Sequence, residues 1–267
     1  MDVLLIGYGA VAQEVLQRIG PEENATISSF LVRPSRAREV KPILSQRGVE
    51  VVSSLEELSQ LPALAAECAG HEAVRAYGEK FLRRGVNFLV ISIGALADQK
   101  LYSDLITAAE TGGAKLILAA GAVAGVDALV SARVAGLKSV QYISRKPPLA
   151  WMGTKAEKEC DLNSIDKATT FYEGTASNAA ISYPQNANVA ATIALAGLGF
   201  SETMVKLVAD PNIDGNIHQI RVEGVFGSFE MEIRGNPLPD NPKTSMLAAH
   251  SVVAEIRRRA SSLEIGG

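Results

Sequence analysis

The first fifteen residues predict a strand, a glycine turn and a helix in immediate succession, and this order constrains the fold more than any other stretch. A short apolar run over residues 3–6 leads into Gly7-Tyr8-Gly9-Ala10-Val11-Ala12, and a segment with helical spacing follows. The glycines and the alanine have the G-x-G-x-x-A spacing of a dinucleotide-binding turn. Because a strand precedes the turn and a helix follows it, the sequence predicts a nucleotide site here.

Each small residue of this turn has a physical role. Gly7 allows the tight turn out of the strand, and Gly9, which has no Cβ, lets a pyrophosphate approach the backbone. Ala12 lets the helix pack close to the strand. The N–H groups at the helix start, around Ala10 and Val11, favour a negatively charged group. We therefore predict that Gly7, Gly9, Ala10 and Val11 bind the cofactor.

Composition limits the class of protein. The chain has 267 residues, 47% of them hydrophobic, which is enough for one large or two modest domains. A net charge of −3 argues against a nucleic-acid partner. No apolar run reaches the length of a membrane span, and Cys68 and Cys160 lie too far apart to suggest a disulfide framework. We expect a cytoplasmic protein with no membrane partner.

Residues 1–120 alternate between strand and helix patterns, which predicts an α/β domain with a Rossmann-type, doubly wound parallel sheet. The expected strands are 3–6, 27–32, 64–69, 86–93 and 115–120. The expected helices are 10–19, 36–47, 71–84 and 99–112.

The pattern changes after residue 120, and residues 121–239 predict a smaller α+β domain for substrate binding and oligomerisation. Runs at 137–144, 204–209, 217–223 and 228–234 read as strands, and the last two alternate between apolar and polar residues. Such alternation is typical of a largely antiparallel sheet with one face covered. We expect an Ala-rich helix after Pro184, and a C-terminal segment, 240–267, whose helix packs back on the first domain.

The end of the second strand indicates which nucleotide is bound. An acidic residue there would hold the ribose 2′-hydroxyl of NAD, but this chain has Arg33-Pro34-Ser35-Arg36. Guanidinium groups suit a 2′-phosphate. We therefore expect NADP to be accepted, with NAD also possible.

The next strand end carries Cys68-Ala69-Gly70-His71, at the sheet edge where ligands bind in open α/β folds. Its small residues permit close approach of the cofactor, so Ala69, Gly70 and His71 are candidate cofactor-binding residues. Cys68 and His71 have no further Cys or His partners nearby, so we expect no metal site.

His218 begins an alternating strand after Asp214-Gly215-Asn216. A histidine at a strand end is a candidate general base or acid because its ordinary pKa lies near neutrality. From spacing alone, a surface or packing histidine is the favoured interpretation of this position. His250, among small apolar residues of the last helix, is interpreted as structural.

The chain resembles the L-aspartate dehydrogenases of the NAD-biosynthesis type over nearly its whole length. The order and spacing of the shared pieces are more specific than any one of them. The pieces are 7–12, Glu67 to Val74, Ser92 to Asp98, Gly121 to Leu129, Pro184 to Ala191, Asn216-Ile217-His218, Asn236-Pro237 and Asn241 to Ser245.

The resemblance implies NAD(P)-dependent oxidation of L-aspartate to iminoaspartate, which hydrolyses to oxaloacetate and ammonia or feeds quinolinate synthesis for pyridine nucleotide biosynthesis. His218 matches the catalytic histidine of the family, which would accept the ammonium proton or activate the water that attacks the imine. Ala124 and Asn188 match positions at the nicotinamide end of the cofactor. The candidates for holding the substrate carboxylates are Arg145, Lys146, Lys155 and Lys243.

Other interpretations stay open at this stage. A homoserine-dehydrogenase-like or dihydrodipicolinate-reductase-like enzyme would share the glycine turn and an α+β second domain. A non-catalytic NADP(H) sensor would keep the nucleotide site and turn over no amino acid. The alternating strands of the second domain leave a face that a partner subunit would cover, so we expect a homodimer or a higher oligomer.

Overall fold

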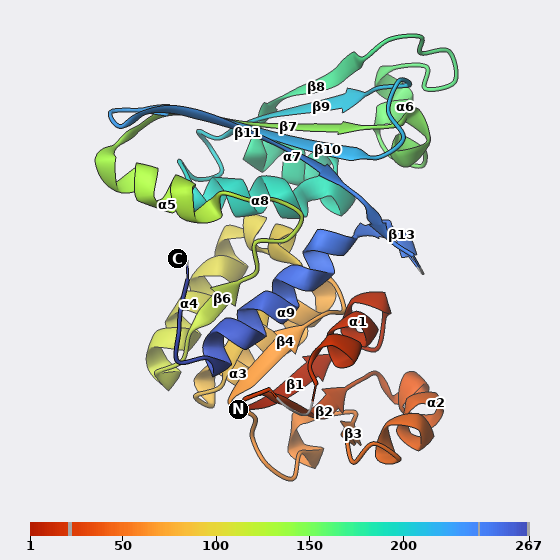
Figure 1. Cartoon of the computed structure of the whole chain (residues 1–267), viewed down its shortest axis with the longest axis vertical. Coiled ribbons are helices and arrows are strands. Elements are labelled where there is room, and N and C mark those ends of the chain that lie inside the picture. Colours follow the sequence, from red (N-terminus) through yellow and green to blue (C-terminus); the bar gives the residue numbers. More distant parts are fainter. Residues whose placement is uncertain (21–22, 240, 266–267) are drawn as a thin grey trace. The chain divides into compact units, whose positions relative to one another are not determined.

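A computed structural model describes residues 1–20, 23–239 and 241–265, apart from the side chains of residues 185, 242 and 243. These residues form two compact units. The first comprises Met1–Ala119 together with Ala248–Ile265, and the second comprises Ala120–Leu247. Each unit contains a sheet and the helices that pack on it (Figure 1).

The first unit contains a six-stranded sheet in which every strand is parallel to its neighbours, in the order β3-β2-β1-β4-β5-β6. The prediction of a Rossmann-type sheet is therefore confirmed. The central strands are buried on both faces, which explains why they read as continuous apolar runs. The strands are β1 (Asp2–Ile6), β2 (Thr26–Leu31), β3 (Glu50–Val52), β4 (Leu64–Glu67), β5 (Asn87–Val90) and β6 (Leu116–Leu118).

Helices connect these strands and cover the sheet: α1 (Ala10–Arg18), α2 (Pro34–Ser45), α3 (His71–Arg83) and α4 (Gln99–Gly112). The strand order reverses between β1 and β4, because the chain adds β2 and β3 on one side of β1 before returning to the other. In open α/β sheets the ligand binds at this reversal, outside the carboxyl ends of the strands.

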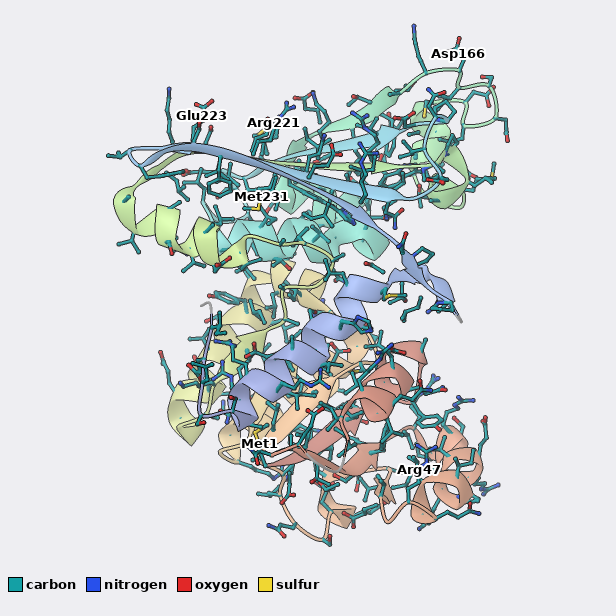
Figure 2. The ribbon with its side chains drawn as sticks, in the orientation of Figure 1. Met1, Arg47, Asp166, Arg221, Glu223 and Met231 are labelled. Carbon is teal, nitrogen blue, oxygen red and sulfur yellow. The ribbon has the colours of Figure 1, made fainter. Side chains whose placement is uncertain are left out.

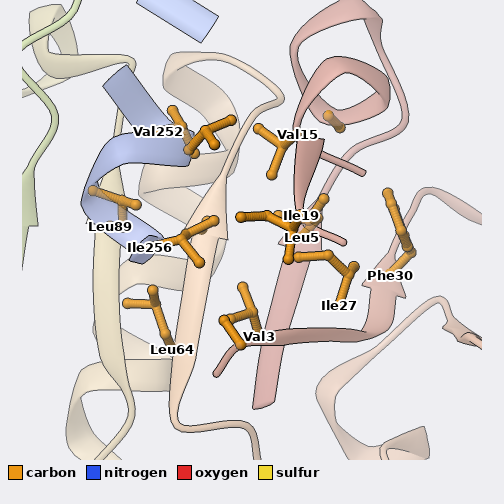
Figure 3. Packing of buried hydrophobic residues seen from close by; sticks show 14 of the residues in the cluster. Val3, Leu5, Val15, Ile19, Ile27, Phe30, Leu64, Leu89, Val252 and Ile256 are labelled. Atoms are coloured by element: carbon orange, nitrogen blue, oxygen red, sulfur yellow. The ribbon is translucent and has the colours of Figure 1, made fainter. Parts of the chain in front are cut away.

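The last helix, α9 (Met246–Ala260), contributes to the core of the first unit (Figure 3). Val252 and Ile256 are fully buried in the same cluster as Val3 and Leu5 of β1 and Leu64 of β4. The apolar face of α9 thus covers the middle of the parallel sheet.

The second unit contains a five-stranded sheet in the order β11-β10-β7-β9-β8. All neighbours are antiparallel except β7 and β9, which confirms a largely antiparallel α+β domain. β8 lies in a stretch for which we predicted no strand. The strands are β7 (Leu137–Lys146), β8 (Thr169–Thr175), β9 (Met204–Ala209), β10 (Asn216–Gly224) and β11 (Gly227–Gly235).

The two faces of this sheet differ because successive side chains of a strand point to opposite sides. Helices α5 (Val126–Ala135), α7 (Ala176–Ser182) and α8 (Ala187–Ala196) lie against one face (Figure 1). Figure 2 shows Met231 of β11 on this helix side, and Arg221 and Glu223 of β10 on the other. The apolar face is therefore the one that the helices cover.

The remaining elements are short. They are β12 (Pro237–Leu238) and β13 (Asn241–Ser245), the helix α6 (Ala156–Glu159), and the 3-10 turns η1 (Leu55–Glu57), η2 (Ile93–Ala97), η3 (Pro148–Trp151) and η4 (Pro184–Asn186). β12 pairs with β13 in an antiparallel arrangement. In the described part of the chain, no helix has both the length and the apolar character needed to cross a bilayer.

Candidate functional site

A cavity of about 740 Å³ lies where β1, β2 and β4 end, at the reversal of strand order. It brings together four of the predicted cofactor-binding residues, namely Gly7, Gly9, Arg33 and Ala69. The lining residues are Ile6, Gly7, Tyr8, Gly9, Leu31, Val32, Arg33, Arg36, Cys68, Ala69, Glu72, Ala73, Ala76 and Tyr77.

The glycine turn fits a pyrophosphate for two geometric reasons. Gly7 has φ +90°, and a Cβ on it would lie 2.7 Å from the Cβ of Ala69, so no side chain is tolerated. Gly9 is the N-cap of α1 and a Cβ on it would meet nothing within 4 Å, which leaves open space in front of the helix N-terminus. Gly9 has no side chain that could cap the helix, so the N–H groups at the positive end of the helix dipole are open to this space.

Arg33 and Arg36 both line the cavity where β2 passes into α2. Arg33 is exposed, whereas Arg36 is partly buried and its Nη1 donates to Glu39 Oε2 at 2.6 Å. Two guanidinium groups at this strand end suit a phosphate on the ribose.

Other predicted positions lie beside the cavity but do not line it. Ala10 and Val11 form the first turn of α1, and Gly70 and His71 begin α3. The prediction overlooked the cavity-facing side of α3, where Ala73 and Ala76 join the lining. Small residues at helical spacing after a strand end were the available signal, because they let a ligand approach the helix.

The buried carboxylate of Glu67, which ends β4, joins two neighbouring strand ends. Its Oε1 accepts hydrogen bonds from the N–H groups of Ala69 (2.7 Å) and Gly70 (2.6 Å) and from Ser92 Oγ (3.0 Å). Its Oε2 accepts from the Ser92 N–H at 3.0 Å. Burial raises the pKa of Glu67, and these four donors oppose that shift. Glu67 thereby holds Ala69 in the wall of the cavity.

The remaining predicted positions belong to the second unit. Ala124 is exposed in the loop before α5, and Asn188 is partly buried in the first turn of α8. His218 lies near the start of β10 and is only 5% exposed, so it is not a surface histidine.

The His218 ring has a buried hydrogen-bond partner on the neighbouring strand β7. The Tyr142 hydroxyl lies 2.8 Å from His218 Nδ1, and the two rings are nearly parallel, 18° apart with centroids separated by 6.0 Å. Burial lowers the pKa of His218 to about 4, and the positive charge of Lys146 contributes to this shift. The ring is therefore neutral at pH 7.

Among the candidate cations whose side chains the structure describes, Lys146 is the one whose charge acts on His218. Its Nζ donates to Asn186 Oδ1 at 2.6 Å and lies 5.1 Å from the centre of the Trp151 ring. Burial lowers the pKa of Lys146 to about 8.

The other candidate cations have different surroundings. Arg145 donates to Asp210 at 3.3 Å, and half-exposed Lys155 pairs with Glu159 at 3.5 Å. The Lys243 side chain lies outside the described residues. His250 bonds Glu14 Oε1 at 2.8 Å, a contact between α9 and α1. Among the described residues no group of three or more His, Cys, Asp or Glu is arranged to hold a metal ion.

The fold and the cavity define a class: a two-domain protein with a dinucleotide-binding domain. Family models match both parts of the chain. Residues 7–119 match the NAD-binding domain described for homoserine dehydrogenase, and residues 127–259 match the C-terminal domain described for aspartate dehydrogenase.

Full-length relatives narrow the class. An L-aspartate dehydrogenase of Ralstonia nicotianae is 43% identical over 99% of this chain and 100% of its own length, and one of Pseudomonas aeruginosa is 41% identical with the same coverage. The crystal structure of aspartate dehydrogenase from Thermotoga maritima matches with a TM-score of 0.78 and 27% identity, covering 100% of this chain and 99% of that one. The chain belongs to the aspartate dehydrogenase family.

Replacing Gly7 tests the close approach between the glycine turn and Ala69. We expect Gly7→Ala to weaken NADH binding by tenfold or more, because the new Cβ must displace Ala69 from the cavity wall. The positive φ adds a strain of about 1–3 kcal/mol. NADH fluorescence titration measures the affinity, and urea unfolding measures the stability.

Gly48→Ala is the matched control. Gly48 also has a positive φ, +71°, but a Cβ on it would meet nothing within 4 Å, and it does not line the cavity. It should lose stability and keep NADH affinity. Equal NADH affinities for the two variants would contradict the role of the Gly7–Ala69 contact.

Proposed function

We propose that this chain oxidises L-aspartate with a nicotinamide nucleotide and releases iminoaspartate, which hydrolyses to oxaloacetate and ammonia or enters pyridine nucleotide biosynthesis. The observation that carries the proposal is that buried His218 lies within the electrostatic reach of partly buried Lys146, in the region that matches the aspartate dehydrogenase C-terminal model. The family membership and the dinucleotide-type cavity support it.

The bound nicotinamide would accept the hydride that leaves Cα of aspartate. The chain's own residues would hold the substrate in a fixed geometry and transfer one proton. His218 is the acid–base group of this proposal because its neutral imidazole has one donor and one acceptor nitrogen. Asn188 and Ala124 remain the residues proposed to contact the nicotinamide end.

Lys146 is proposed to bind a carboxylate of the substrate. A buried ammonium group strengthens an ionic hydrogen bond, and its existing partner, Asn186, is a neutral amide that leaves the positive charge uncompensated. The ion pairs of Arg145 and Lys155 make these two residues weaker candidates.

The cavity of the first unit is proposed to accept NADP as well as NAD. Arg33 and Arg36 line it at the end of β2, where a 2′-phosphate would lie, and the carboxylate that NAD-specific sites use is replaced there by arginine. An oligomer, from a homodimer upward, and a cytoplasmic location stay predictions.

Two alternatives are distinguished by one assay. A related enzyme would reduce NAD or NADP with homoserine or another amino acid and leave aspartate unused. A sensor would bind NADPH tightly and turn over no amino acid. Screening amino acids with both nucleotides at the absorbance of reduced nicotinamide separates all three.

Substituting His218 tests its role directly. We expect His218→Ala to lower kcat for L-aspartate by about 10²–10⁴-fold, because general acid–base groups contribute this much. Affinity for NADH should stay unchanged, since the affected step concerns the amino acid. His250→Ala is the control, because His250 bonds Glu14 and should leave kcat unaltered. A near-normal kcat for His218→Ala would remove His218 from the mechanism.

Lys146→Met should raise KM for aspartate by about 10–100-fold, the loss expected for one ionic hydrogen bond. In the unsubstituted enzyme the ammonium form exists below its pKa of about 8, so KM for aspartate should rise as pH increases through 8. Steady-state kinetics between pH 6.5 and 9.5 measure both effects. Lys155→Met is the control and should leave KM unchanged. A flat KM profile would exclude Lys146 as the carboxylate partner.

The double variant Arg33→Ala/Arg36→Ala tests nucleotide choice. We expect kcat/KM for NADP⁺ to fall by about 10–100-fold and that for NAD⁺ to change little, because only NADP carries the 2′-phosphate. Arg38→Ala removes a charge from the same segment at a residue that does not line the cavity, and should preserve the ratio. Parallel loss with both nucleotides would contradict the assignment.

A further inference from the structure

Three buried polar side chains, those of Ser144, Tyr142 and His218, form a hydrogen-bonded row across β7 and β10. The antiparallel register sets Ser144 opposite His218 and Tyr142 opposite Ile220, so all four residues share one face of the sheet. Ser144, Tyr142 and His218 are each at most 5% exposed. The Tyr142 hydroxyl lies 2.8 Å from His218 Nδ1 and also hydrogen-bonds the Ser144 side chain. Tyr142 is thus the middle member of this hydrogen-bonded row.

The chemistry of these groups sets the direction of the hydrogen bonds. A phenol is a stronger donor than a neutral imidazole N–H, and an imidazole nitrogen is a stronger acceptor than a hydroxyl oxygen. Burial raises the pKa of Tyr142, so the phenol keeps its proton. Tyr142 therefore donates to His218 Nδ1, and the Ser144 hydroxyl donates to the oxygen of Tyr142.

We propose that Tyr142 is a positioning residue that holds neutral His218 in the form with its proton on Nε2. Nδ1 is occupied by the tyrosine, so Nε2–H is the group that the ring offers to a ligand. The inference rests on the proposed function, in which His218 meets the substrate.

This tautomer gives His218 a defined task. A neutral ring with Nε2–H donates a hydrogen bond to a carboxylate or to the imine nitrogen of the product. Of the acid–base role proposed for His218, this form supplies the donor part, because Nε2 already carries a proton and Nδ1 is occupied by Tyr142.

Nitrogen NMR of the full chain labelled with ¹⁵N-histidine reads the tautomer without any substrate. The chain has three histidines, so the spectrum is simple, and His218→Asn assigns the signal. At pH 7 we expect the His218 signals of one neutral tautomer, with Nε2 protonated and Nδ1 bare. A protonated Nδ1 with a bare Nε2 would overturn the proposal.

Tyr142→Phe keeps the ring and removes only the hydroxyl. We expect the His218 signals to become those of mixed tautomers, and kcat with aspartate to fall by about tenfold, the effect of one neutral hydrogen bond. NADH affinity should not change. Unchanged His218 signals in this variant would also refute the role of Tyr142.

Tyr172→Phe is the matched control, because its hydroxyl donates to the Thr175 carbonyl at 3.0 Å and not to a histidine. It should preserve the His218 signals and kcat. Failure of the proposed function has a separate readout, because aspartate turnover would then survive His218→Ala. The tautomer is read from the nitrogen NMR spectrum and does not depend on the identity of the substrate.

Discussion

The four hydrogen bonds to the buried carboxylate of Glu67 are the interaction on which the nucleotide cavity depends. They tie the end of β4 to the end of β5 through Ser92 and fix the peptide of Ala69. Ala69 in turn lies so close to Gly7 that no Cβ fits between them. The glycine turn and the neighbouring strand end therefore fix each other's position, and α1 begins directly after that turn.

A buried carboxyl group of this kind is tolerated only if hydrogen bonds replace the water that it loses. An ionised carboxyl away from water is costly unless hydrogen bonds replace hydration, and Glu67 has donors on both oxygens. Three of the four donors are backbone N–H groups at strand ends, which would otherwise need partners of their own. The same bonds satisfy both requirements, so a glutamate at the last position of β4 strengthens the sheet edge where the ligand binds.

The sequence predicts those parts of the molecule that depend on local pattern. The G-x-G-x-x-A turn and the buried strands of the first unit follow from glycine chemistry and apolar runs, and the structure has them where they were expected. β3 and β8 were missed because three residues, or a polar edge strand, give no clear period. The cavity wall on α3 had a local signal, small residues at helical spacing, that the prediction overlooked. The Tyr142–His218 bond joins residues distant in sequence, and no local signal shows such pairing.

Burial lowers the pKa of both His218 and Lys146 in the second unit, but the charges that result at pH 7 differ, and the outcome suits an anionic ligand. It lowers the pKa of His218 to about 4, which removes a second positive charge, and that of Lys146 to about 8, which leaves the ammonium form dominant at pH 7. With Tyr142 donating to Nδ1, the neutral ring contributes an N–H donor beside the cation. In the proposed site a dicarboxylate would meet one charge and one neutral donor, so binding would not require two adjacent cations. Mutual repulsion between them is avoided by the same burial that strengthens each hydrogen bond.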